Sequence, residues 1–352
     1  MTKTPLEHPL PASSPPSPPS PPLTGQGRAR AVLRNIAIAS CLPYLALKAA
    51  WIAGSRLGIP DGSSLLDHRT TMIVANAATI LMDGSVVVIA LLLTQARGLR
   101  VPAWLMALPM WTATGLLLPI MAGFPVQLLV GLLGGGTPAT ANAGRRPFLD
   151  DWVFGVVYTG FIVQGLALGA LFVLYAKDRW GSLWQGALRD LPDSPTTPAL
   201  RIGAVVAAVI ALVPATMHLL WAAGGTAALN PSRIEERTSG FYALQAVDVL
   251  FAAATVAGLL LLAFRRTGKL PLWVPLALAW GGSGAMACWG GWMSIASLTG
   301  AQEISDEPTT GMVLLYAVQM LVGAVVVTQG AYFFAERAAA VREAAEPSGP
   351  RP

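Results

Sequence analysis

Long apolar runs dominate the chain, each near the ~20 residues that an α-helix needs to cross a bilayer. Polar and glycine- or proline-rich segments separate these runs. The pattern predicts an all-α integral membrane protein with eight transmembrane helices, at about residues 35–56, 72–94, 101–122, 152–175, 202–224, 240–264, 271–297 and 311–335.

Two other segments differ from these runs. The stretch 123–135, GFPVQLLVGLLGG, is apolar but too short to cross, and we expect an interfacial or re-entrant piece at the outer face. The N-terminal segment contains PASSPPSPPSPPL, whose Pro and Ser residues cannot build a packed core. The expected organisation is a disordered tail at 1–34, helical units at 35–175 and 202–335, and a short tail at 336–352.

The two helical units share residues in register. LKAAWIAG aligns with MHLLWAAG at an offset of 170, and VPAWLMALPMWTATG aligns with LPLWVPLALAWGGSG at an offset of 169. Because Trp is rare, its three matched pairs favour a duplicated four-helix unit over chance similarity between membrane helices. Each unit has an even number of crossings, so both copies are predicted to run in the same direction, as two parallel repeats. The matched pairs are Lys48 and His218, Trp51 and Trp221, Gly54 and Gly224, Pro102 and Pro271, Trp104 and Trp273, Trp111 and Trp280, and Gly115 and Gly284.

Composition supports the membrane class. The chain is 54% hydrophobic and 12% charged, with a mean hydropathy of +0.58 and a net charge of +5. The basic residues lie in short blocks beside apolar runs, which indicates membrane topology and not nucleic-acid binding. Their excess on one side predicts a protein of the cell membrane with both termini in the cytoplasm. Cys41 and Cys288 both lie inside apolar runs and support neither a disulfide framework nor a metal site.

Four ionisable side chains interrupt the apolar runs: Lys48, Asp83, His218 and Asp248. A Lys or Asp at the centre of a spanning helix costs about 2.5–3.5 kcal/mol on insertion scales, so these groups must face the interior, pair or change protonation. In one interpretation, Lys48 with Asp83 and His218 with Asp248 are structural pairs that fix helix packing. In the other, all four gather in one pocket beneath the outer leaflet, because they lie at similar predicted depths.

Aromatic and amide side chains accompany the ionisable groups. Tryptophan faces stabilise cations, and Tyr and Gln side chains can orient a bound molecule. We expect these residues to bind substrate: Trp51, Trp111, Trp221, Trp280, Tyr158, Tyr316, Gln164 and Gln245, with Gln319 completing a polar ring.

No motif assigns a cofactor or a metal. The sequence has no phosphate loop, GxSxG, HExxH or DDxxD pattern, and the Asp150–Asp151 pair is typical of a helix N-terminus. Three classes remain: an enzyme that protonates a lipophilic alkene, a proton- or ion-coupled transporter, and a non-catalytic accessory protein. Metal-free, proton-initiated terpene cyclisation is the cyclase chemistry that this residue set can support. The expected partners are a lipophilic prenylated substrate and membrane lipid.

A family resemblance points the same way. LPYLALKAAWIAGSRLGIPDGSSLLD resembles a group of actinobacterial multi-pass proteins, whose relatives include membrane-bound terpene cyclases that close farnesylated indoles into drimane-type rings. MHLLWAAGG is similar to the H-x-x-W-x-x-G-G opening of small four-span proteins. The resemblance implies the fold and the reaction class, and no catalytic residue is carried over from it.

The proton donor is chosen from the residues themselves. A pair with Lys48 would keep Asp83 ionised and unfit as an acid. We therefore expect Asp248 to be the first choice as donor and Asp83 the second, with His218 and Lys48 setting their protonation.

Overall fold

The structure is a computed structural model in which residues 25–66, 69–136, 149–194, 196–235, 237–265, 268–299 and 307–345 are described. These residues form helices, short 3₁₀ turns and loops, without a β-strand. The long helices are α1 (Gly25–Ile52), α2 (Arg69–Thr94), α3 (Ala103–Leu132), α5 (Asp151–Trp184), α6 (Thr197–Ala222), α8 (Ser239–Phe264), α9 (Trp273–Thr299) and α10 (Thr310–Ala345). Short elements join them: η1 (Ser64–Leu66), η2 (Ala96–Arg100), η3 (Leu188–Asp190) and α7 (Pro231–Glu235).

Seven helices in the described part of the chain are long and apolar enough to cross a membrane: α1, α2, α3, α5, α6, α8 and α10. The expected multi-pass membrane architecture is confirmed at this level. Helix α9 has 27 residues, but its sequence WVPLALAWGGSGAMACWGGWMSIASLT is rich in Gly and Trp, which lower its hydropathy. It packs against α3, α8 and α10.

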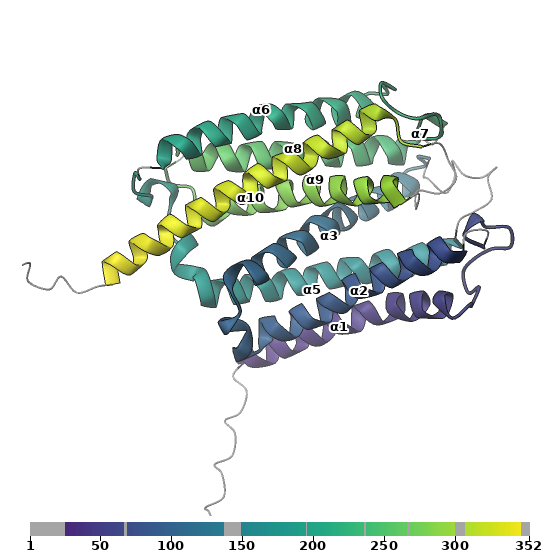
Figure 1. Ribbon diagram of the computed structural model, residues 1–352, viewed down its shortest axis with the longest axis horizontal. Helices are drawn as coiled ribbons and strands as arrows, with labels where there is room; N and C mark the ends of the chain where they lie inside the picture. Colours follow the sequence, from purple (N-terminus) through teal and green to yellow (C-terminus); the bar gives the residue numbers. More distant parts are fainter. Residues whose placement is uncertain are drawn as a thin grey trace, which may run out of the picture.

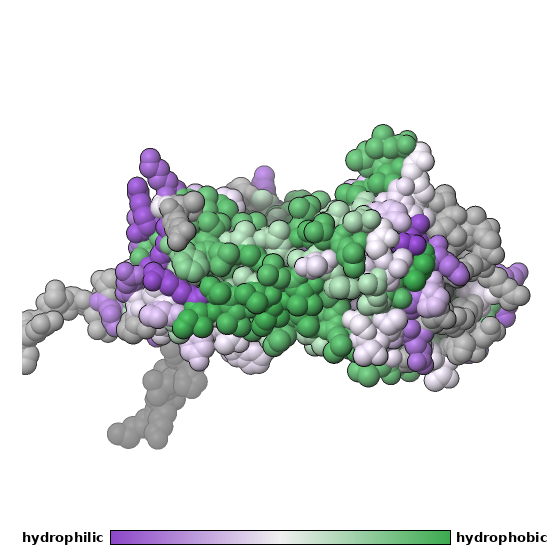
Figure 2. Space-filling view, turned by 90° about the horizontal axis from the view of Figure 1, so that it is seen from above, coloured by the Kyte–Doolittle hydropathy of each residue, from purple (hydrophilic) through white to green (hydrophobic). Residues whose placement is uncertain are grey.

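The helices form two groups, with α1, α2 and α5 on one side and α6, α8 and α10 on the other (Figure 1). Helices α3 and α9 lie between the groups and contact each other. The start of α1 and the end of α10 lie at the same end of the bundle (Figure 1). The surface in Figure 2 shows a broad apolar zone between two polar ends, as lipid contact requires. Large side chains exposed on the spans include Leu81, Leu250 and Leu314.

Three predicted boundaries are wrong because the helices run further than the apolar runs. Helix α1 begins at Gly25, inside the expected tail, and Arg30 on its first turns pairs with Asp178 of α5 at 2.5 Å. Helix α3 continues through most of 123–135, so the expected re-entrant piece is the C-terminal part of a long apolar helix. Helix α10 continues to Ala345, inside the expected C-terminal tail. Continuing a helix satisfies backbone groups that would otherwise be unpaired near lipid.

The turns after α1 and α6 have the same hydrogen bonds. Trp51 Nε1–H donates to the carbonyl of Leu57 at 2.7 Å, and Trp221 Nε1–H donates to the carbonyl of Ala227 at 2.8 Å. Matched residues near the end of each helix adopt positive φ, +96° at Gly54 and +92° at Gly224. A second matched pair, Gly58 at +74° and Ala228 at +63°, follows. The two tryptophans therefore hold equivalent loops, whatever else they contact.

Replacing Trp221 by phenylalanine is expected to lower the free energy of unfolding by about 1 kcal/mol, the usual net contribution of one hydrogen bond. The ring still fills part of its buried site, but the Ala227 carbonyl loses its donor. Thermal unfolding in detergent measures the change. Trp104→Phe is the control, because Trp104 is 65% exposed at the start of α3. Equal stability of the Trp221→Phe protein and the control would contradict the assigned role.

Candidate functional site

One cluster of polar side chains lies within α6, α8 and α10. His218 Nδ1 lies 2.7 Å from Gln245 Oε1 and 3.6 Å from Asp248 Oδ2. On the opposite side of the ring, Gln319 Nε2 lies 3.0 Å from His218 Nε2. The sequence predicted the contact between His218 and Asp248, and the structure brings these two residues together. We call His218, Gln245, Asp248 and Gln319 the histidine cluster.

The two amide side chains limit how His218 can be protonated. Gln245 presents an oxygen to Nδ1, and Gln319 presents an amide nitrogen to Nε2. A neutral imidazole with its proton on Nδ1 satisfies both contacts. Rotating the Gln319 amide would instead suit an imidazolium that donates from both nitrogens. The cluster can therefore accommodate either a neutral His218 or a charged one.

Asp248 is the accessible member of the histidine cluster. Its side chain is 38% exposed, whereas that of His218 is 10% exposed. Asp248 lies one turn after Gln245 on α8. Protein atoms surround most of its side chain, and part of the side chain remains exposed. An acid that remains accessible beside a sequestered histidine can exchange a proton with a bound molecule.

A second cluster lies among α1, α2 and α5. Gln164 Nε2–H donates to Asp83 Oδ1 at 3.5 Å, and both residues are buried. Lys48 of α1 lies nearby and interacts electrostatically with Asp83. We call Lys48, Asp83 and Gln164 the lysine cluster.

The expected ion pair between Lys48 and Asp83 is not formed. Among the residues that the structure describes, no carboxylate lies within ion-pair distance of Lys48. Instead, Lys48 Nζ lies 5.0 Å from the ring centre of Tyr44 and 4.9 Å from that of Trp51. A cation on an aromatic face is stabilised by the ring quadrupole. Tyr44 was missing from the predicted site, although its i, i+4 spacing from Lys48 was a readable signal.

The prediction of one shared pocket for all four ionisable groups is wrong. The two clusters lie on opposite sides of α3 and α9, and no hydrogen bond, ion pair or ring contact joins them within the described residues. The two carboxylates also differ in their position along the helices. Asp83 is more than one turn further from the start of α2 than Asp248 is from the start of α8. The sequence indicated long apolar helices, but not the separation of the two groups of helices.

The tryptophans that the sequence predicted to bind substrate contact other protein groups. Trp111 Nε1–H donates to Ser283 Oγ at 3.3 Å, and Trp280 stacks on Phe172 at 5.4 Å between ring centres. Trp111 therefore joins α3 to α9, and Trp280 joins α9 to α5, and neither contact involves an ionisable side chain. Trp51 faces Lys48, and Trp221 lies edge-on to His218 at 5.3 Å.

The two predicted tyrosines also lie beside the clusters and not within them. Tyr158 packs edge-to-face on Phe124 at 5.1 Å, and Tyr316 is buried in α10 one turn before Gln319. Of the predicted amides, Gln164 and Gln245 contact ionisable groups directly, as does Gln319.

Helices α3 and α9 cross closely at two glycines. A β-carbon at Gly115 would lie 2.3 Å from the carbonyl oxygen of Gly284, and one at Gly284 would lie 3.3 Å from the α-carbon of Gly115. Gly115 and Gly284 are a matched pair in the sequence, so equivalent positions of the two units meet. The crossing holds the histidine and lysine clusters on either side of it.

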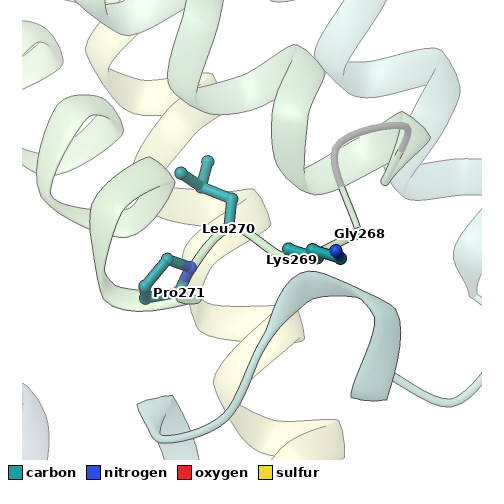
Figure 3. A pocket seen from close by; sticks show the side chains of 4 residues that line it. All are labelled: Gly268, Lys269, Leu270 and Pro271. Atoms are coloured by element: carbon teal, nitrogen blue, oxygen red, sulfur yellow. The ribbon is translucent and has the colours of Figure 1, made fainter.

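The surface depression drawn in Figure 3 lies elsewhere. It is open and is lined by Gly268, Lys269, Leu270 and Pro271, in the loop after α8. Asp248 lies in the first half of α8, whereas this depression follows the end of α8, so the depression is apart from the histidine cluster.

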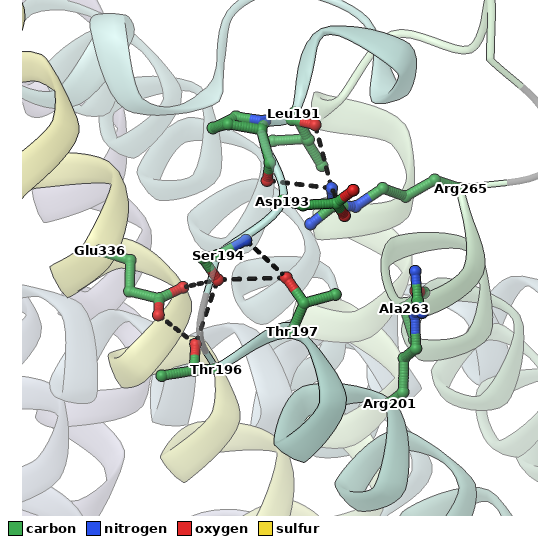
Figure 4. A network of polar contacts seen from close by, with 10 residues as sticks. Leu191, Asp193, Ser194, Thr196, Thr197, Arg201, Ala263, Arg265 and Glu336 are labelled. Atoms are coloured by element: carbon green, nitrogen blue, oxygen red, sulfur yellow. Dashed lines mark hydrogen bonds and ion pairs between the residues drawn. The ribbon is translucent and has the colours of Figure 1, made fainter.

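A polar network at that same end ties the connection between α5 and α6 to its neighbours (Figure 4). Glu336 accepts hydrogen bonds from the hydroxyls of Ser194 and Thr196. Arg265 donates to the carbonyl of Leu191 at 3.0 Å and lies 3.3 Å from Asp193. Burial lowers the pKa of the Arg265 guanidinium, and Asp193 opposes that shift. These contacts anchor the helix ends and carry no evident chemistry.

Within the described residues, no three His, Cys, Asp or Glu side chains gather where a metal ion could be held. Cys41 and Cys288 are free thiols. A scan against protein-family models, a search of curated proteins and a search of solved structures each gave no match.

Proposed function

We propose that the chain is a membrane enzyme that uses Asp248 to protonate a lipophilic, prenylated substrate and so initiates terpene cyclisation without a metal. The observation that carries the proposal is the accessible carboxyl of Asp248, 3.6 Å from a sequestered His218. The family resemblance noted from the sequence points to the same reaction class.

The proposed architecture has eight spans in two parallel four-helix repeats, with α9 as the eighth span. The common location of the start of α1 and the end of α10 supports an even number of crossings (Figure 1). The equivalent turns at Trp51 and Trp221 support the repeat, as does the meeting of matched Gly115 and Gly284. We also propose that this end of the bundle faces the cytoplasm of the cell, because basic residues such as Arg28, Arg30 and Arg342 lie on the helix ends there.

The proposed reaction begins with a neutral cluster. Asp248 holds a proton while His218 is neutral, with its Nδ1 proton donated to Gln245. The acid transfers its proton to one carbon of a terminal alkene, and the neighbouring carbon becomes a cation. Ring closure follows as each remaining alkene donates its π electrons to the cation.

The reaction ends by returning the proton. The Asp248 carboxylate removes a proton from a carbon next to the final cation, which restores the acid, and the electrons of that C–H bond form the new alkene. The product therefore has the same mass as the substrate, which makes the enzyme an isomerase. No oxidant, reductant or cofactor enters this balance.

A proton-coupled transporter is the second candidate. Two separate ionisable clusters, one on each side of the α3–α9 crossing, are an arrangement that a carrier can use to couple proton binding to movement of its halves. The same clusters in an accessory protein would only fix packing.

An assay with one probe distinguishes these candidates. Proteoliposomes containing the purified protein and a pH-sensitive dye in their lumen would be incubated with a farnesylated indole, with protein-free liposomes as control. The enzyme predicts a product of unchanged mass but altered chromatographic retention, with ring protons visible by NMR. Substrate-dependent acidification of the lumen without a product would favour the carrier. If neither a product nor acidification is observed, the proposed reaction is contradicted and the accessory role remains.

A further inference from the structure

The buried contact between Asp83 and Gln164 leaves one oxygen on each residue without a partner. Asp83 Oδ1 accepts from Gln164 Nε2, but neither Asp83 Oδ2 nor Gln164 Oε1 has a hydrogen-bond partner among the described residues. Asp83 is 7% exposed and Gln164 is 1% exposed. Buried polar atoms are almost always satisfied, so two unsatisfied acceptors on neighbouring side chains call for a missing donor.

An ionised Asp83 would lack a counterion at bonding distance. Lys48 Nζ is held against the rings of Tyr44 and Trp51 and forms no ion pair with the carboxylate. A buried carboxylate with one long hydrogen bond is costly, and such a group is commonly neutralised by binding a proton.

We propose that Asp83 is a membrane-buried proton-binding site whose proton lies on Oδ2 and is donated to Gln164 Oε1. The acid hydroxyl and the amide carbonyl would then form the second hydrogen bond of a cyclic carboxylic acid–amide pair joining α2 to α5. One proton satisfies both orphaned oxygens at once, whereas a protonated Lys48 at its observed position satisfies neither.

The surroundings of Asp83 couple this proton to Lys48. Helix α1 presents Cys41, Tyr44 and Lys48, and α5 presents Gln164 to Asp83 and Tyr158 to Tyr44. The Cys41 thiol donates to the Ala37 carbonyl at 3.1 Å and is not the missing donor. The short η1 and η2 pack near the two ends of α2. Loss of the proton would leave a carboxylate that attracts Lys48 away from its aromatic faces, so the site has two states that differ in charge and in side-chain position.

This site is separate from the histidine cluster and does not depend on the proposed reaction. The proton at Asp83 serves as a charge switch within α1, α2 and α5, and the low exposure of Asp83 keeps it from a bulky substrate. Its test therefore needs no activity.

Infrared spectroscopy of the protein in liposomes tests the site, because a protonated carboxyl has a C=O stretching band distinct from that of a carboxylate. The wild-type spectrum minus that of Asp83→Asn is expected to contain one protonated-acid band, which disappears as the pH is raised. Asparagine keeps the shape and both hydrogen bonds of the pair, so this variant is expected to fold. Gln164→Leu is expected to retain the band at a higher wavenumber, because the acid loses its acceptor. The matched control, Asp150→Asn at the exposed end of α5, should leave the band unchanged.

Coinciding wild-type and Asp83→Asn spectra in the protonated-acid region would overturn the proposal. If Asp83→Asn fails to fold, Asp248→Asn protein labelled with ¹³C-carboxyl aspartate gives the second measurement. An isotope-shifted protonated-acid band must remain in that protein, and its absence would overturn the proposal equally.

Discussion

Asp248→Asn is expected to slow formation of the cyclic product by a factor of about 10²–10⁴, the usual contribution of a positioned acid–base group. Asparagine has nearly the same shape as aspartic acid but cannot release a proton to an alkene. The carboxyl at this position is 38% exposed and lies 3.6 Å from His218, so it is the group of the histidine cluster that can reach a substrate. Single-turnover conversion of the farnesylated indole measures the loss.

The control for this substitution is Asp150→Asn, which removes a carboxylate from the N-cap of α5, where it makes no side-chain capping hydrogen bond. Its rate should match the wild type. Asp248→Glu distinguishes chemistry from packing, because it keeps an acid and is expected to retain part of the rate lost in Asp248→Asn. Wild-type turnover by Asp248→Asn would remove Asp248 from the mechanism.

The largest structural effect is expected from Gly115→Ala, which should destabilise the protein by about 1–3 kcal/mol or more. The added β-carbon would lie 2.3 Å from the carbonyl oxygen and 2.5 Å from the carbonyl carbon of Gly284, a distance that real β-carbons do not reach. Relief requires α3 and α9 to separate, because the obstacle is backbone and not a flexible side chain. Chemical denaturation in mixed micelles measures the change.

Gly169→Ala is the matched control, since no described residue outside its own stretch of α5 lies within 4 Å of a β-carbon built there. Alanine should be neutral or slightly stabilising there, because its helix propensity exceeds that of glycine by about 1 kcal/mol. Gly284→Ala should fall between the two, with its nearest contacts at 3.3 Å. An unchanged stability for Gly115→Ala would mean that the two groups of helices do not depend on this crossing.

The tertiary structure changed the reason for choosing Asp248 as the proton donor, but not the choice. The sequence argument disfavoured Asp83 because a pair with Lys48 was expected to keep it ionised, yet Lys48 lies on the rings of Tyr44 and Trp51. Asp248, in contrast, is the carboxyl with a histidine within 4 Å. Accessibility now favours Asp248 as the donor, and accessibility is a property of packing that no spacing along the chain reveals.

Local sequence patterns were sufficient to predict the structural class of the protein and several side-chain contacts. Apolar runs of membrane length determined an all-helical, multi-pass protein, because backbone groups in lipid must bond within their own helix. The i, i+3 spacing of Gln245 and Asp248 placed both on one face of α8, where each approaches His218. Helix ends were less readable, since α1 and α3 continue into segments whose composition predicted a tail and a re-entrant piece.

The tertiary structure alone decided which buried groups meet. Hydropathy places a residue along the membrane normal, but it contains no information on rotation about that axis or on which helices are neighbours. Crossing of α3 and α9 at Gly115 and Gly284 separates the lysine cluster from the histidine cluster, although the sequence put both at one depth. Depth follows from the free energy of transferring each helix into lipid, whereas lateral grouping follows from close contact between particular surfaces, and only the folded chain determines the latter.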